Sequence, residues 1–135
     1  MFNINIMSDQ PIYEQIIKNI KELSLKKLLK PNDQLPSVRK MASILSVNPN
    51  TVSKAYQELE RQEIIITLRG RGTFMNPDTD ISVDDNRVED ALDKLRDICI
   101  ELAHLGWDNK KILEEIENIN ADIRKGGQKW LRYEE

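Results

Sequence analysis

The sequence has little of the chemistry that supports disulfides, zinc sites or membrane insertion. It contains one cysteine and one histidine in 135 residues, so no internal disulfide can form and a structural zinc site lacks its usual ligands. No apolar run approaches the roughly 18 residues that a membrane helix requires. The N-terminus also lacks the basic and apolar segments of a signal peptide. We therefore expect a cytoplasmic protein with no membrane partner.

Motifs typical of enzymes are missing as well. The sequence has no phosphate-binding glycine loop before a helix, no HExxH zinc motif and no nucleophile elbow. The acidic residues within 78–90 lack the glycine and the spacing of an EF-hand calcium loop. His104 is the one histidine of the sequence, and we expect a helix-end or surface residue there, not a metal ligand. We expect Cys99 to be a small, buried apolar residue. We expect neither catalysis nor a metal nor a cofactor.

Charge is distributed unevenly along the chain. Residues 1–76 carry 11 Lys and Arg against 7 Asp and Glu, a net charge of +4. Residues 77–135 carry 9 Lys and Arg against 16 Asp and Glu, a net charge of −7. A basic half beside an acidic half suggests two roles, with a polyanion bound by the first half.

Hydrophobic periodicity predicts three helices in the N-terminal half. Apolar residues recur at spacings of three and four over 10–29, 37–45 and 49–62. Ser37 and Asn48 suit the caps of the second and third helices, and Pro49 suits a first turn. Residues 30–36 contain two prolines and an Asn-Asp pair, so we expect a loop there.

A β-hairpin is expected directly after the third helix. The segment 64–68 is rich in β-branched residues and 73–75 forms a second short strand, with the glycine-containing turn 69–72 between them. The order of helix, helix, short turn, helix and hairpin predicts a winged helix-turn-helix. The fold class is therefore mainly α with a small β-hairpin, and the predicted DNA-binding domain spans 1–76.

The C-terminal half predicts an antiparallel two-helix hairpin. A polar, acidic linker over 77–86 precedes a hairpin over 87–123, which turns at Gly106, and a tail covers 124–135. Each helix carries a narrow apolar seam that two helices alone cannot bury. We expect these seams to form the interface of a homodimer: Val88, Leu92, Leu95, Cys99, Leu102, Leu105, Ile112, Ile116 and Ile119.

In a winged helix-turn-helix, the second helix of the turn motif enters the major groove with its N-terminal residues at the base edges. The candidates there lie opposite the apolar face of the helix: Asn48, Asn50, Thr51, Ser53 and Lys54. Asparagine can bond bidentately to adenine and a threonine methyl can contact thymine, whereas lysine suits phosphate. Arg39 on the preceding helix can reach a phosphate or a guanine edge. Arg69, Gly70 and Arg71 suit a wing that approaches phosphates or a minor groove.

The same residues carry a family resemblance. The runs LPSVRKMASILSVNPNTVSKAYQELE (35–60) and RGRGTFM (69–75), preceded by PIYEQI (11–16), resemble the DNA-binding domain of GntR-type bacterial repressors. The short helical segment that follows is similar to the YtrA-like branch of that family. This resemblance implies that the arginine at 39, the start of the recognition helix and the tip of the wing contact DNA.

The chain departs from the family pattern at four glycines. Lys27, Asn32, Ser46 and Glu63 stand where the family usually has glycine. If the left-handed backbone conformation is kept, each of the three residues other than asparagine costs roughly 1 kcal/mol. We expect consequences for local turns and stability, because these positions do not read DNA.

The leading hypothesis is a dimeric repressor that binds a double-stranded, inverted-repeat operator, with transporter genes as targets implied by the YtrA-like resemblance. The alternative is a dimeric winged-helix adaptor that mediates protein–protein contacts, which should show an apolar patch where the recognition helix and wing are polar. The sequence identifies neither the operator nor a small-molecule effector.

Overall fold

A computed structural model describes residues 4–78 and 84–125 of the chain. Its contacts define two compact units, one formed within residues 4–78 and the other within 84–123. Half of the predicted linker (79–83 of 77–86) and most of the predicted tail (126–135 of 124–135) lie outside the described residues. The domain boundaries expected from the sequence therefore stay predictions, and the two units are described separately.

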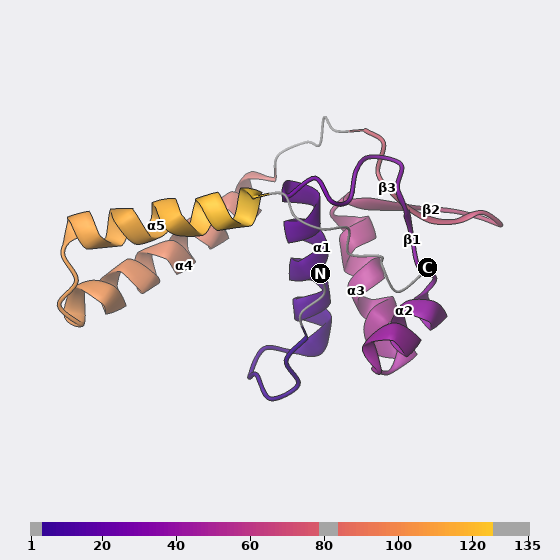
Figure 1. Cartoon of the computed structure of the whole chain (residues 1–135), viewed down its shortest axis with the longest axis horizontal. Helices are drawn as coiled ribbons and strands as arrows, with labels where there is room; N and C mark the ends of the chain where they lie inside the picture. The colour runs from indigo at the N-terminus through magenta and orange to yellow at the C-terminus, as the bar shows by residue number, and fades with distance from the viewer. Residues whose placement is uncertain (1–3, 79–83, 126–135) are drawn as a thin grey trace. The chain divides into compact units, whose positions relative to one another are not determined.

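Three helices build the core of the first unit (Figure 1). They are α1 (Ile12–Leu25), α2 (Val38–Leu45) and α3 (Pro49–Arg61), and α3 packs against both of the others. Ile16, Ile20 and Leu59 are fully buried where these helices meet. Burial of each such side chain contributes about 1.5–3 kcal/mol. The predicted helical periods thus correspond to faces that do pack together.

Helices α2 and α3 begin at the predicted caps. The Ser37 Oγ accepts a hydrogen bond from the Lys40 backbone N–H at 3.1 Å, and the Asn48 Oδ1 accepts one from the Asn50 N–H at 2.8 Å. Each cap satisfies an N–H that the helix itself leaves unpaired, a contribution of about 1 kcal/mol. Pro49 occupies the first turn of α3, as expected.

All three helices end in the same backbone motif. The N–H of the residue after the turn bonds to a carbonyl five positions earlier, at 2.9–3.0 Å in each case. This Schellman arrangement requires a left-handed residue, usually glycine. Here the left-handed positions are held by Lys27 (φ 60°), Ser46 (φ 55°) and Glu63 (φ 62°). Asn32 (φ 72°) is left-handed as well, so all four departures from glycine fall on left-handed backbone positions.

The first helix is shorter than its sequence pattern predicts. Leu28 and Leu29 continue the apolar spacing, yet α1 ends at Leu25. The left-handed Lys27 turns the chain, and the N–H groups of Leu28 and Leu29 both reach the Leu23 carbonyl. Leu29 is still buried, so it joins the core from the turn instead of from the helix.

The hairpin belongs to a three-stranded antiparallel sheet, ordered β1-β3-β2. Strands β2 (Ile65–Leu68) and β3 (Gly72–Met75) form the predicted wing. Strand β1 (Gln34–Leu35) corrects the expectation of a loop over 30–36, because it pairs with Phe74 and Thr73 of β3. Two residues are too few to show an alternating pattern, so only the pairing across the fold reveals this strand.

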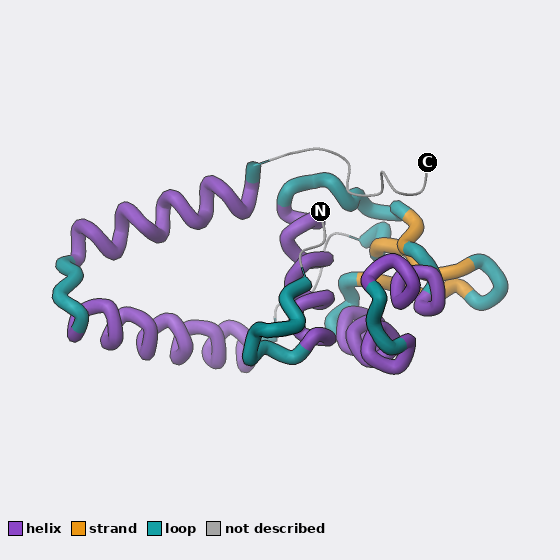
Figure 2. Tube along the Cα trace, turned by 60° about the horizontal axis from the view of Figure 1, so that its bottom comes forward, coloured by secondary structure: helices purple, strands orange, loops and turns teal. Residues whose placement is uncertain are grey.

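The second unit consists of α4 (Asp85–His104) and α5 (Asn109–Arg124), joined by a turn at Gly106 (φ 94°). Asp84 caps α4, and the Asp108 Oδ1 accepts a hydrogen bond from the Lys111 N–H at 2.8 Å at the start of α5. The two helices diverge from the turn (Figure 2). Between their described residues, no pair of Cα atoms comes within 8 Å. The predicted helical hairpin is present, but its arms do not cover each other.

Within residues 4–78 and 84–125, no helix combines the length and the apolar character needed to cross a membrane.

Candidate nucleic-acid interface

Helix α3 separates a buried apolar face from an exposed polar face. Val52, Ala55 and Leu59 are fully buried, whereas Asn50 and Lys54 on the opposite side are exposed. Helical spacing also places Ser53 and Gln57 on the polar side. Packing against α1 and α2 therefore fixes the rotation of α3 and keeps its polar side chains on the face opposite the core.

The predicted contact residues at the start of α3 have different roles. The Asn48 Oδ1 is committed to the Asn50 N–H, which leaves the Asn48 Nδ2 donors and a single lone pair of its carbonyl oxygen for another partner. Thr51 is half-buried, while Asn50 is exposed. A bidentate contact with adenine needs both the carbonyl and the amide of one side chain. Asn50 therefore suits base reading better than Asn48, whose carbonyl already caps the helix.

The ammonium group of Lys54 is held against α1. Its Nζ lies 3.9 Å from the centroid of the Tyr13 ring, within cation–π range. Lys54, Tyr13 and Gln57 line one shallow depression together with Glu58 and Arg61. Arg61 in that depression is paired with Glu58 at 2.6 Å, so its charge is locally compensated. Lys54 brings the positive charge that phosphate recognition needs, at a position set by Tyr13.

Arg39 lies exposed in the first turn of α2, the helix that precedes α3 in the helix-turn-helix. It forms no ion pair with any residue in the described parts of the chain. Lys40 beside it is also exposed. The helix that crosses the DNA backbone in this fold thus presents cationic side chains at its exposed end.

The wing ends in a three-residue loop, Arg69–Arg71, between the paired residues Leu68 and Gly72. The Arg71 N–H donates to the Leu68 carbonyl at 2.9 Å, and Gly70 takes φ 80°. A Cβ at Gly70 would meet no atom within 4 Å. Backbone conformation, not lack of space, is therefore the reason for glycine at this position.

Both wing arginines are exposed and make no ion pair among the described residues. Within the first unit, α2 and the hairpin tip lie on the side away from α1 in both views (Figures 1 and 2). A helix-turn-helix with exposed amides and cations, next to a cationic wing, matches the polarity that double-stranded DNA demands.

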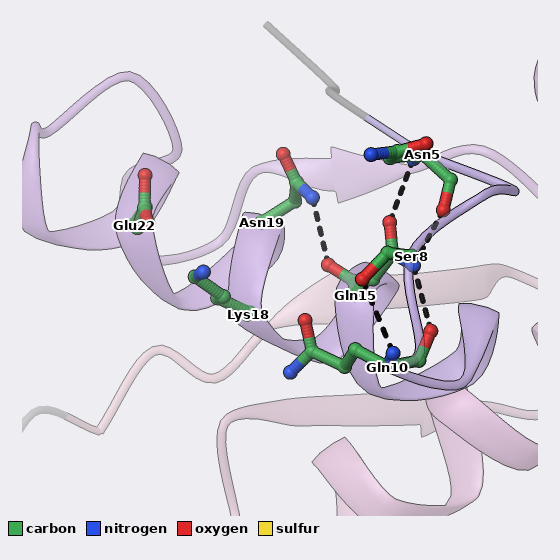
Figure 3. Close-up of a pocket in the computed structure, with 7 residues that line it drawn as sticks. All are labelled: Asn5, Ser8, Gln10, Gln15, Lys18, Asn19 and Glu22. Carbon is green, nitrogen blue, oxygen red and sulfur yellow. Dashed lines mark hydrogen bonds between the residues drawn. The ribbon is translucent and has the colours of Figure 1, made fainter.

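A polar hollow of about 240 Å³ lies elsewhere in the unit, beside the N-terminal half of α1 (Figure 3). Gln15 at its base is 5% exposed. Its Oε1 accepts from the Asn5 N–H at 2.7 Å, and its Nε2 donates to the carbonyls of Asn5 and Gln10 at 3.0 and 2.8 Å. Gln15 thereby binds the N-terminal segment to α1 and has no free polar atom directed at a ligand.

The predicted interface residues of the hairpin are poorly covered. Cys99, Leu102, Ile112 and Ile116 are half-buried, and five others are exposed: Val88 (45%), Leu92 (56%), Leu95 (43%), Leu105 (67%) and Ile119 (48%). Ile98 (56%) and Leu113 (51%) widen the same apolar faces and were missed, because the sequence reading followed one narrow seam. Ile98 lies three positions after Leu95 and Leu113 three positions before Ile116, and this helical spacing was the available signal.

Three more polar residues of the first unit were also missed. Gln57 extends the polar face of α3, and its spacing of seven from Asn50 could have indicated this. Tyr13 and Gln34 act on Lys54 and on the wing from distant parts of the chain. No local pattern identifies such contacts, since they depend on tertiary packing.

A winged helix-turn-helix with a polar recognition helix and a cationic wing defines the class of DNA-binding transcription regulators. Comparison with known proteins agrees: the sequence profile of the bacterial regulatory proteins of the gntR family matches residues 12–75. The chain is 46% identical over 129 residues to the HTH-type transcriptional repressor YtrA of Bacillus subtilis (strain 168), covering 96% of this chain and 98% of that protein. The chain belongs to the GntR family and is a transcription regulator, not an enzyme.

Solved structures extend the similarity to both units. A transcriptional antiterminator from Listeria monocytogenes EGD-e superposes with a TM-score of 0.88 at 43% identity, covering 95% of this chain and 96% of that one. YtrA from Sulfolobus acidocaldarius, a GntR-family transcription factor, gives a TM-score of 0.52 at 32% identity, covering 91% and 99%. The expected fold class, family and regulatory function are thereby confirmed.

Proposed function

We propose that two copies of this regulator pair through their helical hairpins and bind an inverted-repeat operator, where they repress transcription in the cytoplasm. The observation that carries the proposal is that the unit with the exposed polar face of α3 also carries two exposed wing arginines, neither of which forms an ion pair with a described residue. Each protomer would read one half-site, with Asn50 at base edges and the cations at phosphates. A two-fold dimer presents two such surfaces, which is why the operator should be an inverted repeat.

The divergence of α4 and α5 supports pairing through the hairpin. Apolar side chains with exposures of 43–67% line both helices, and the helices do not pack on each other. Monomeric proteins rarely leave so continuous an apolar surface in water. A second hairpin related by a two-fold axis would cover all four seams in a four-helix bundle.

Sedimentation of a matched pair of variants tests the dimer. Leu95→Glu places a carboxylate in the seam, where desolvation costs several kcal/mol per ion, so we expect monomers. Ile100→Glu makes the same change at an exposed apolar residue five positions away, on another face of α4, and should leave dimers intact. If Leu95→Glu still sediments as a dimer at micromolar concentration, the hairpin does not form the dimer interface.

DNA fragments selected by the purified protein from a genomic pool would define the operator, and fluorescence anisotropy would measure its affinity. Binding should weaken steeply with salt because cations displace phosphate counterions. Arg69→Glu combined with Arg71→Glu should weaken binding more than about tenfold, since charged contacts are lost. Lys94→Glu combined with Arg96→Glu, at exposed residues of α4, makes the same change in net charge away from the wing and is the control for charge alone. Salt-independent binding, or equal loss in both variants, contradicts the proposed contacts.

Transcription from a selected promoter fragment tests repression. The protein should reduce initiation when its site overlaps the promoter, and a terminator placed downstream reports read-through, the activity for which the Listeria relative is named. The resemblance to YtrA-like regulators favours transporter genes as targets, which the positions of selected sites in the genome would reveal.

A dimeric adaptor remains the competing function. An adaptor would need an apolar patch on α3 and the wing, whereas Asn50, Lys54, Arg69 and Arg71 are exposed there. The wing charge-reversal variant bears on both functions, because it should abolish operator binding and should leave the dimer of an adaptor intact.

A further inference from the structure

The wing tip is held by a residue outside its own hairpin. Gln34 of β1 pairs with Phe74 of β3, and its side-chain Nε2 donates a hydrogen bond to the Arg71 carbonyl at 3.2 Å, across 37 residues of sequence. The side chain of Gln34 thus extends along the sheet toward the base of the arginine loop.

Gly72 provides the space for this contact. A Cβ at Gly72 would lie 2.8 Å from the Gln34 Nε2, closer than real Cβ atoms approach, and the residue also takes φ 118°. A side chain at Gly72 would therefore displace the amide of Gln34 and strain the backbone as well. The glycine and the glutamine form one local arrangement at the C-terminal side of the loop.

The loop has few other restraints. Its own turn closes with one backbone hydrogen bond, from the Arg71 N–H to the Leu68 carbonyl. Gly70 and Gly72 both have positive φ, and nothing surrounds the position of a Gly70 side chain. Two glycines in an exposed loop allow many backbone conformations. The Gln34 contact restrains the loop from a strand that the core holds in place through buried Leu35.

We propose that Gln34 is a positioning residue for DNA recognition, which orders the tip of the wing so that Arg69 and Arg71 are oriented before DNA binds. The inference rests on the proposed function, because it assumes that the wing arginines contact DNA. A loop ordered in advance loses less conformational entropy on binding, so affinity rises without any contact between Gln34 and the nucleic acid.

Two substitutions isolate the hydrogen bond. Gln34→Met keeps the length of the side chain and removes the donor, and Gln34→Asn keeps the amide but shortens its reach. Because Gln34 is exposed and lies outside the core, both variants should fold, and loss of one exposed hydrogen bond should lower the thermal unfolding midpoint by a few degrees at most. Loss of one exposed hydrogen bond should weaken DNA binding about two- to tenfold.

The experiment measures affinity for a selected DNA fragment in two backgrounds, with the full chain throughout. In the natural background, Gln34→Met and Gln34→Asn should weaken binding. In a background with Arg69→Ala and Arg71→Ala, the same changes should have no effect, because no arginine remains to be oriented. Unchanged affinity in the natural background, or equal loss in both backgrounds, overturns the inference.

Backbone ¹⁵N relaxation of the free protein gives a readout that does not depend on DNA. Order parameters at Gly70 and Arg71 should fall in Gln34→Met, while those of β1 and α3 stay unchanged. Equal order at the tip overturns the positioning role. If Arg69→Ala with Arg71→Ala binds DNA as tightly as the natural chain, the proposed wing contact fails instead, and the order parameters still decide whether Gln34 holds the loop.

Discussion

Glycine substitutions at the ends of the three core helices should stabilise this protein. Lys27, Ser46 and Glu63 hold left-handed conformations that cost a residue with a Cβ about 1–2 kcal/mol each. Glycine removes that strain but adds about 0.4–1 kcal/mol of conformational entropy to the unfolded chain. The net gain is about 0.5–1 kcal/mol per site, or about 1.5–3 kcal/mol for Lys27→Gly, Ser46→Gly and Glu63→Gly together.

The gain should be visible in thermal unfolding. For a domain of 60–100 residues, 1 kcal/mol shifts Tm by about 4–8 °C, so the triple variant should unfold about 6–24 °C higher. Circular dichroism at one fixed protein concentration is required, since association also stabilises the folded state. Binding of DNA should stay unchanged, because none of the three residues belongs to the exposed face of α3, to the start of α2 or to the wing.

A neighbouring residue provides the control. Lys26 directly precedes Lys27 and has φ −76°, an ordinary helical value. Lys26→Gly therefore relieves no strain and should lower stability by about 0.5–1 kcal/mol. The two Lys→Gly changes, one residue apart, are expected to have opposite signs. A similar loss of stability in both would refute the assignment of strain to the left-handed lysine.

Three substitutions test the separate roles of Arg39, Asn50 and Tyr13 in the candidate interface. Arg39→Ala should weaken binding to every DNA sequence and reduce the slope of log affinity against log salt by about 1, as for a lost phosphate contact. An unchanged slope combined with an altered sequence preference would instead indicate that Arg39 contacts a guanine. Asn50→Ala should relax base preference at one operator position by about 1–3 kcal/mol in binding assays with mutated sites, and uniform loss on all sites would contradict base reading. Tyr13→Leu should weaken DNA binding about two- to fivefold, because it releases Lys54 from its cation–π contact, and it should have no effect in a Lys54→Met background. If Tyr13→Leu instead binds DNA more tightly, the ring competes with phosphate for the ammonium group.

The sequence predicts the local structure of the first unit well, for a physical reason. Helical spacing, the caps Ser37 and Asn48 and the glycines of the wing are all local signals, and the structure follows them. Strand β1 was missed because its two residues have no pattern of their own and exist as a strand only through pairing with β3. The end of α1 was placed too late because a left-handed lysine carries no local signal of its turn.

The candidate site was predictable as a set of residues but not as a set of contacts. Types and spacing indicated Asn50, Lys54 and the wing arginines as polar and cationic positions. The restraints on them come from Tyr13 and Gln34, which lie 41 and 37 residues away from Lys54 and Arg71 in sequence. Such contacts arise only when α1 and β1 are brought beside α3 and β3 by the core.

The acidic half of the chain is expected to contribute to DNA affinity indirectly. Residues 77–135 carry a net charge of −7, so this half of the chain as a whole repels a polyanion. Pairing of two hairpins would instead hold two basic domains together, and the second half-site would then be bound at an effective concentration that can reach millimolar. On this reasoning, a variant that dissociates the hairpins, such as Leu95→Glu, loses operator affinity without losing any residue that faces DNA.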